Sequence, residues 1–253
     1  MVKSPNIVCV AGPEELAEKA LEIFDECFSR AVAERERFFV AFSGGKTPEK
    51  FFQLLGQSGK TQGRQWDKAE LFWADERCVA PERHASNFGL AAGTFLHRSA
   101  IRQSNIHRIR CEHRTPQQAA SEYEKTIKDV FGRCDVEFDL ILLGLGRDGH
   151  IASLMPGSDA LKITDRLTAA VVLSAKDYPR ITLTASVLCS ARKLVVMISG
   201  AEKQSIVKTI FTSEPRPDLW PVHLLWPALD RVVWLIDKSA CGELSFEGSG
   251  TGQ

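Results

Sequence analysis

The chain has 253 residues, of which 44% are hydrophobic and 25% are charged. These are ordinary globular values, and this length lets one α/β domain bury a full core without disulfides or metals, so we expect a single domain over residues 1–253. Lysine plus arginine balances aspartate plus glutamate at 32 each, which argues against nucleic acid or an anionic membrane surface as a partner.

The cysteines and the N-terminal residues indicate a cellular compartment. Seven cysteines are scattered along the chain with no C-x-x-C pair and no zinc-ligand spacing, which is typical of reduced thiols in a cytosol. The first 12 residues lack the basic region and the apolar stretch of a signal peptide, and no run approaches the ~20 apolar residues of a membrane span. We therefore expect a cytoplasmic protein with no membrane partner.

The first predicted element is a long helix. Pro13 followed by two glutamates suits a helix start, and apolar residues recur at helical spacing as far as Ala31, so we expect a helix over residues 13–35. After it come short runs rich in β-forming residues, which we interpret as buried strands. These runs are residues 38–42, 71–74, 140–143, 169–173, 194–198 and 232–236.

Helix-start signals lie between these strands, at residues 47–49, 86–87 and 115–118, the last with the spacing of a capping box. The alternation predicts an α/β fold, a Rossmann-like, doubly wound and mostly parallel sheet with helices on both faces. Residues 215–227 are rich in proline and predict a long ordered loop or lid without an evident role, and about 242–253 predict a flexible tail.

Ligands of doubly wound sheets bind beyond the carboxyl ends of the strands, so we look for a site in the loops there. The first loop directly follows an apolar strand and directly precedes a helix, where backbone N–H groups and the helix dipole favour a phosphate. The alternative is that its two glycines only make a tight turn. The loop residues are Ser43, Gly44, Gly45, Lys46 and Thr47.

The second loop carries three charges, those of Asp75, Glu76 and Arg77, at the end of a strand that contains Trp73. Carboxylates and a guanidinium there suit a polar substrate, and the alternative is a solvated surface turn. Ser86 further on is explained as the N-cap of a helix.

The third loop, residues 144–150, begins with a literal G-x-G-x-x-G and ends in His150. The glycines alone would suggest a dinucleotide, but Pro156 interrupts any following helix and the nearest acid after the next strand is Asp177, so we disfavour a nicotinamide cofactor. Histidine is the side chain that serves as base and acid near neutral pH, which makes His150 the leading catalytic candidate, although a lone histidine is often structural.

Two cations complete the candidates, Arg180 and Lys203, the latter at another transition from strand to helix. Either suits a phosphate, although by themselves both are ordinary surface charges.

Together, residues 42–48, 75–79, 144–150 and 180–184, followed by 200–203 and 232–237, resemble the 6-phosphogluconolactonase family in order and spacing over nearly the whole chain. The resemblance implies a Rossmann-like fold shared with glucosamine-6-phosphate deaminases. It also implies hydrolysis of 6-phospho-D-glucono-1,5-lactone to 6-phosphogluconate in the oxidative pentose phosphate pathway, with no metal and no cofactor. We expect a cytoplasmic monomer.

The related deaminases are the main alternative because they share the glycine-aspartate-glycine-histidine turn. They continue with an asparagine-glutamate pair before the proline, whereas this chain has Leu154 and Met155 before Pro156. Ile151 and Met155 also depart from the common lactonase residues, which leaves fine specificity open. A non-catalytic sugar-phosphate-binding regulator stays possible, and the lack of a G-x-S-x-G elbow disfavours a serine hydrolase.

The resemblance also implies roles for the candidate residues. His150 would take a proton from the water that attacks the lactone carbonyl, and Arg77 or nearby backbone N–H groups would stabilise the oxyanion. Either Asp75 or Asp148 would orient His150. The phosphate would be bound by Arg180, Lys203 and the first loop, that is by Ser43, Gly44, Gly45, Lys46 and Thr47.

Overall fold

The structure is a computed structural model that describes residues 4–57, 64–132, 135–174 and 176–242. All of the predicted tail except Gly242 lies outside the described residues, and the single-domain organisation stays a prediction.

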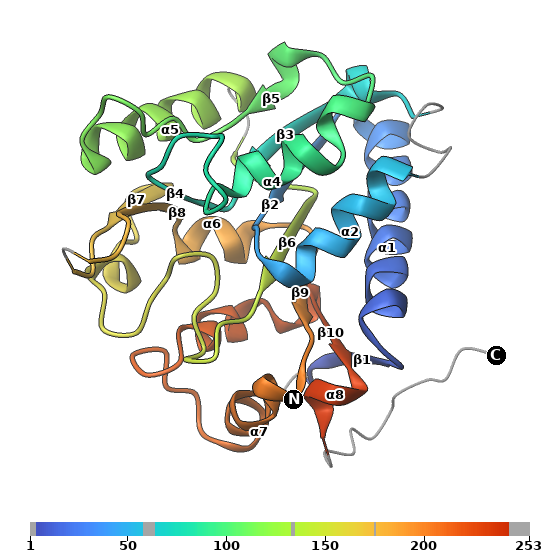
Figure 1. Cartoon of the computed structure of the whole chain (residues 1–253), viewed down its shortest axis with the longest axis vertical. Coiled ribbons are helices and arrows are strands. Elements are labelled where there is room, and N and C mark those ends of the chain that lie inside the picture. Colours follow the sequence, from blue (N-terminus) through green and yellow to red (C-terminus); the bar gives the residue numbers. More distant parts are fainter. Residues whose placement is uncertain (1–3, 58–63, 133–134, 175, 243–253) are drawn as a thin grey trace.

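A parallel sheet of seven strands, in the order β1-β10-β9-β6-β2-β3-β5, forms the centre of the molecule (Figure 1). The chain adds β3 and β5 on one side of β2, then returns to place β6 on the other side and continues outward to β9 and β10. The winding reverses between β2 and β6, which is where such sheets bind ligands. The strands are β1 (Asn6–Val10), β2 (Phe38–Phe42), β3 (Ala69–Trp73), β5 (Ile106–His107), β6 (Leu140–Gly144), β9 (Leu194–Ile198) and β10 (Val232–Asp237).

Helices cover both faces of this sheet. Successive strand residues point to opposite faces, so neighbouring residues of one strand pack against different helices. Phe38 of β2 packs against Phe24 with ring centroids 5.3 Å apart, whereas its neighbour Phe39 stacks on Phe131 at 4.2 Å. Phe24 belongs to α1 (Pro13–Arg35) and Phe131 to α5 (Pro116–Phe131), and Figure 1 shows these helices on opposite sides of the strands. The predicted α/β fold is confirmed.

The predicted helix starts agree closely with the structure. The helix over residues 13–35 is present, Ser86 caps α4 by accepting a hydrogen bond from the Gly89 N–H, and Thr115 forms the capping box of α5. The remaining helices are α2 (Lys46–Gln57), α4 (Asn87–Thr94), α6 (Ala185–Ser190), α7 (Gln204–Thr212) and α8 (Lys238–Cys241). Short 3-10 helices are η1 (Trp66–Lys68), η2 (Leu96–Arg98), η3 (Gln103–Asn105), η4 (Asp159–Lys162), η5 (Ala201–Lys203) and η6 (Pro221–Arg231).

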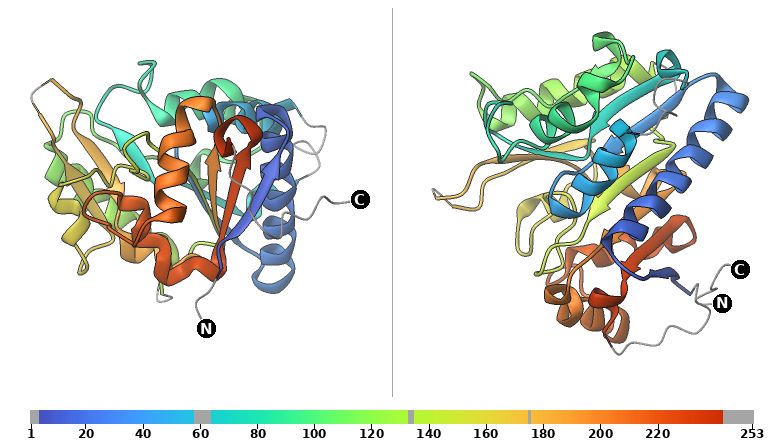
Figure 2. Two further views of the ribbon diagram at one scale, coloured as in Figure 1. Left: turned by 90° about the horizontal axis from the view of Figure 1, so that it is seen from below. Right: turned by 45° about the vertical axis from the view of Figure 1, so that its right-hand side comes forward.

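A second, antiparallel sheet corrects one expectation. The run 169–173 does not join the parallel sheet. It contributes β7 (Thr168–Val171), which pairs with β8 (Arg180–Leu183). In turn, β8 pairs with β4 (Asp75–Arg77). Val172 and Leu173 lie beyond the strand and are 57% and 47% exposed. Figure 2 shows β7 and β8 projecting from the body on the side away from α1. Apolar composition identified a strand here but not the sheet that it joins.

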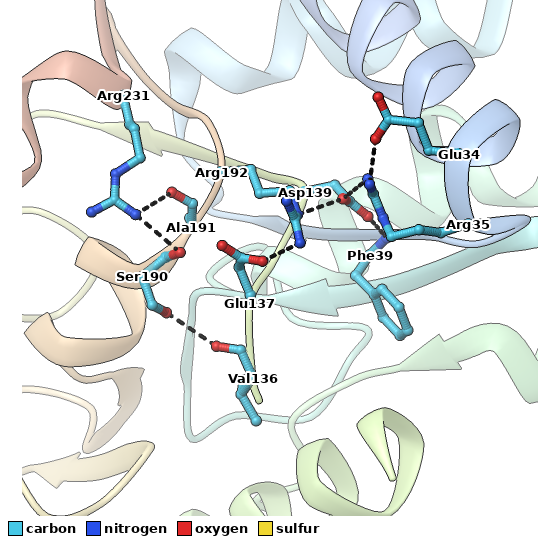
Figure 3. A network of polar contacts seen from close by, with 10 residues as sticks. All are labelled: Glu34, Arg35, Phe39, Val136, Glu137, Asp139, Ser190, Ala191, Arg192 and Arg231. Carbon is cyan, nitrogen blue, oxygen red and sulfur yellow. Dashed lines mark hydrogen bonds and ion pairs between the residues drawn. The ribbon is translucent and has the colours of Figure 1, made fainter. Parts of the chain in front are cut away.

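A network of charges lies at the amino ends of β2, β6 and β9 (Figure 3). Asp139, just before β6, is buried and accepts a hydrogen bond from Arg35 at 2.7 Å and one from the Phe39 N–H at 2.8 Å. Arg192, just before β9, forms ion pairs with Asp139 and Glu137. These contacts tie three neighbouring strands together at the edge opposite the candidate loops.

Candidate active site

The candidate loops meet at a cavity of about 560 Å³ beyond the carboxyl ends of the central strands. Its lining includes every residue proposed from the sequence except Asp148: Ser43, Gly44, Gly45, Lys46, Thr47, Asp75, Arg77, His150, Arg180 and Lys203. The loops after β2 and β6 contribute from the point where the winding of the sheet reverses. The small sheet contributes Arg77 and Arg180, which lie opposite each other in adjacent strands.

His150 is held by the glycine turn that precedes it. The Gly146 N–H donates to the His150 carbonyl at 2.8 Å, and Gly149 adopts φ 79°, which glycine tolerates best. A Cβ atom at Gly146 would lie 2.1 Å from the His150 Nδ1 atom, so the ring position requires glycine there. The turn is therefore shaped around the imidazole.

Asp148 is the carboxylate that contacts His150. Its Oδ1 atom lies 2.5 Å from His150 Nδ1, and this hydrogen bond is the main reason why the pKa of Asp148 falls to about 2. An ionised Asp148 accepts a hydrogen bond from Nδ1–H, which leaves Nε2 free to accept a proton from a ligand. A general base requires such a free ring nitrogen together with a carboxylate that fixes the ring.

Asp75 has a different environment. It is buried, and its carboxylate accepts hydrogen bonds from Ser43 Oγ at 2.9 Å, Ser153 Oγ at 2.7 Å and Asn87 Nδ2 at 3.3 Å. It thereby joins the loop after β2, the start of α4 and the turn after His150. Within the described chain no hydrogen bond connects Asp75 to His150, so its contacts are those of an organising residue.

Glu76 does not face the cavity, although the sequence placed it with its charged neighbours. It is buried, and its carboxylate accepts hydrogen bonds from the Asn87 and Phe88 N–H groups and from Ser86 Oγ. Burial raises the pKa of Glu76. The burial of Glu76 and Asp75 also excludes the alternative of a solvated turn, since the segment anchors the first turn of α4.

Two guanidinium groups in the cavity wall have buried donors that lack acceptors. Arg77 donates from Nη1 to the Ala85 carbonyl at 2.9 Å, but within the described chain its Nε atom and that of Arg180 are buried without a hydrogen-bond partner. Burial lowers the pKa of Arg180, and the nearby charge of Arg77 lowers it further. Both guanidinium groups line the cavity, so two adjacent positive charges make this part of the wall suited to an anionic ligand.

The remaining cationic and glycine residues complete the wall. Lys203 donates from Nζ to the Leu145 carbonyl at 2.6 Å, which bridges the loops after β9 and β6, and burial lowers its pKa. Gly45 has φ 109°, and a Cβ atom at Gly44 would lie 2.1 Å from Asn87 Oδ1. These glycines thus make the turn and leave room for Asn87. Gly44 and Gly45 both line the cavity.

Some contributors were missed from the sequence. Asn87 was interpreted only as a helix start, yet it lines the cavity and contacts Asp75. Ser153 had no signal, because a serine in an apolar stretch has no distinctive spacing. Part of the proline-rich stretch forms η6 rather than a loop, and the Val222 N–H donates to the Gly149 carbonyl at 2.9 Å, so this segment braces the histidine turn.

Comparison with known proteins identifies the family of the chain. Residues 11–234 match the family described as glucosamine-6-phosphate isomerases/6-phosphogluconolactonase. The chain belongs to this family. Within the family it is 35% identical to a 6-phosphogluconolactonase of Synechocystis sp., over 94% of this chain and 97% of that protein.

Solved structures of family members have the same fold. The 6-phosphogluconolactonase of Trypanosoma brucei superposes with a TM-score of 0.84 at 26% identity, covering 96% of this chain and 99% of that one. A monomeric glucosamine-6-phosphate deaminase superposes with a TM-score of 0.75 at 20% identity, covering 93% and 98%. The fold alone therefore does not distinguish the two activities of the family.

The described part of the chain contains no cluster of three or more histidine, cysteine, aspartate or glutamate side chains arranged to hold a metal ion. None of the described helices is long and apolar enough to cross a membrane.

Proposed function

We propose that the protein is a 6-phosphogluconolactonase, which hydrolyses 6-phospho-D-glucono-1,5-lactone to 6-phosphogluconate in the oxidative pentose phosphate pathway. The observation that carries this proposal is the pairing of His150 with Asp148 in a cavity wall that also holds Arg77 and Arg180 with unsatisfied donors. The curated relative from Synechocystis bears the same name.

His150 acts as the general base. Its Nδ1–H donates to Asp148, so Nε2 takes a proton from a water molecule as that water attacks the C1 carbonyl carbon of the lactone. The carbonyl π bond breaks and the oxygen becomes an oxyanion. Protonated His150 then donates its Nε2 proton to the ring oxygen as the C1–O bond breaks, which yields the open-chain acid without a covalent intermediate.

Arg77 stabilises the oxyanion. Its guanidinium lines the cavity together with His150, and its buried Nε–H has no acceptor within the described chain. One preorganised hydrogen-bond donor aimed at the developing oxyanion typically lowers the barrier by about 3 kcal/mol. The Ala85 carbonyl holds the guanidinium in place, so no reorganisation is needed during the reaction.

The phosphate is bound at the start of α2 and by neighbouring cationic side chains of the cavity wall. The first turn of α2 presents N–H groups from the loop that contains Gly44 and Gly45, and the phosphate is further bound by Lys203 and Arg180. Binding a dianion far from C1 fixes the lactone for attack, so we expect these contacts to control affinity more than turnover.

A deaminase is the alternative within the family. Ring opening there requires the carboxylate before the proline, but Leu154 and Met155 occupy those positions here, are buried and do not line the cavity. This favours the lactonase. The cytoplasmic location, the monomeric state and a reaction without a cofactor stay predictions.

The deciding experiment measures acid release from freshly generated lactone above the spontaneous rate. We expect fast hydrolysis by the wild type and a turnover lowered about 100- to 10,000-fold in His150→Ala. His84→Ala is the matched control, because His84 is exposed and lies outside the cavity. Full activity in His150→Ala would remove the histidine from the mechanism, and an inactive wild type that deaminates glucosamine 6-phosphate would replace the lactonase proposal.

A further inference from the structure

Two cysteines far apart in the sequence meet beside the cavity. Cys78 directly follows Arg77 at the end of β4, and Cys111 lies between β5 and α5. Their Sγ atoms are 2.8 Å apart, and the Cys78 N–H donates to the Pro179 carbonyl at 2.7 Å, which fixes the backbone on the Cys78 side. The contact therefore joins the small sheet to the segment that leads into α5.

The two thiols differ in exposure and acidity. Cys78 is partly exposed, whereas Cys111 is buried. The hydrogen bond between them lowers the pKa of Cys78 and raises that of Cys111. Burial raises the pKa of Cys27 to about 11 and that of Cys241 to about 12. Since the thiolate is the reactive form, Cys78 combines accessibility with reactivity.

We propose that Cys78 and Cys111 form an oxidation site that hydrogen peroxide converts to a disulfide. The Cys78 thiolate attacks one peroxide oxygen, the O–O bond breaks, and a sulfenic acid and hydroxide form. The Cys111 sulfur then attacks the Cys78 sulfur, the S–S bond forms and water leaves. In total two thiols lose two electrons and two protons, and one peroxide becomes two water molecules.

Little movement separates the two states. A disulfide has its sulfur atoms about 2.05 Å apart, so the present separation of 2.8 Å closes with a small shift. Arg77 is adjacent but its guanidinium is held by Ala85, so the oxidised protein keeps its cavity. Closing the loop from Cys78 to Cys111 restricts the unfolded chain and raises the unfolding temperature by about 5–10 °C.

The test is a peptide map of the full chain after mild peroxide treatment, alkylation of the remaining thiols and trypsin digestion. Cleavage at Arg77, Arg83, Arg110 and Arg114 releases residues 78–83 and 111–114 as separate peptides. We expect these two peptides to be joined by a disulfide that dithiothreitol reverses. The unfolding temperature should rise on oxidation, and the lactonase rate should stay within about twofold.

Cys9 and Cys241 supply an internal comparison, because they also pair a partly exposed thiol with a buried one, but their sulfur atoms are 3.2 Å apart rather than 2.8 Å. We expect this pair to oxidise more slowly. In Cys111→Ser, oxidation should stop at the Cys78 sulfenic acid, which reacts with dimedone. Cys27→Ser should still form the disulfide between Cys78 and Cys111. The proposal is overturned if the wild-type map contains no peptide joining 78–83 to 111–114, or if Cys9 and Cys241 are joined first.

Discussion

The two edges of the central sheet use charge in opposite ways. At the amino ends of the strands, Asp139 is matched by Arg35, Arg192 and a backbone N–H, so its buried charge is compensated (Figure 3). At the carboxyl ends, Arg77 and Arg180 lie opposite each other with buried donors that no described group satisfies. The buried carboxylate at the first edge is matched by protein groups, whereas the guanidinium groups at the second keep binding capacity for a ligand.

Breaking the compensated edge should have the largest effect on stability. Asp139→Ala removes a carboxylate that is 4% exposed and leaves the Phe39 N–H and two arginines without it. We expect the free energy of unfolding to fall by about 3 kcal/mol in urea titration. The lactonase turnover of the folded fraction should not change, and Glu34→Ala at the exposed rim of the same network should cost far less. A large loss of turnover in Asp139→Ala would contradict the separation of the two edges.

At the other edge, exchanging one carboxylate should affect turnover instead. Asp148→Asn removes the anion that accepts a hydrogen bond from His150 Nδ1–H, so the imidazole loses its preferred tautomer. We expect kcat to fall about 100-fold, with little change in KM, in steady-state assays. Asp75→Asn is the companion variant, and it should lower stability because Asp75 joins two loops and the start of α4. If Asp75→Asn reduced kcat while Asp148→Asn did not, the orienting role would belong to Asp75.

The unsatisfied cations offer a subtler test. Arg180→Met removes a buried unpartnered donor and one of two adjacent positive charges. We expect the substrate-free protein to gain about 1 kcal/mol of unfolding free energy while KM for the phosphorylated lactone rises at least tenfold. Thermal denaturation with and without 6-phosphogluconate separates the two effects. A destabilised variant with an unchanged KM would show that Arg180 stabilises the fold and does not bind the substrate.

The smallest expected effect is the pH dependence of the Asp148 and His150 pair. Because the pKa of Asp148 is lowered to about 2 in the folded protein, its contribution to stability is present above about pH 4 and is lost as the pH falls toward 2. Asp148 is 51% exposed, so solvent screening keeps this contribution under about 1 kcal/mol. The stability difference between the wild type and Asp148→Asn should shrink over that range.

Much of the fold followed from local patterns, and the errors have physical causes. The helix at residues 13–35 and the caps at Ser86 and Thr115 depend on neighbours along the chain, so their signals are local. Residues 169–173 were assigned to the wrong sheet although their partner β8 lies nearby in the sequence, because an apolar pattern identifies a strand but not the sheet that it joins. The failure to identify β1 reflects a pairing partner, β10, that lies far away in the sequence.

The position of the site was predictable from the sequence, but its side-chain contacts were not. The loops after the strands were located because the carboxyl ends of parallel strands share one edge. Which aspartate contacts His150, the burial of Glu76, and the contacts that Asn87 and Ser153 make with Asp75 depend on side-chain geometry between loops. Spacing along one chain carries no information about such contacts, and so they appeared only in the structure.

The pairing of β1 with β10 has a consequence for biosynthesis. Asn6 leaves the ribosome long before its partner Val233 is made. The hydrogen bond from the Val222 N–H to the histidine turn likewise cannot form until Val222 is made. The pairing of Arg77 with Arg180 cannot form until Arg180 is made. The nascent chain therefore carries β1 unpaired until β10 has been made, and the cavity cannot be completed until Val222 has followed the histidine turn.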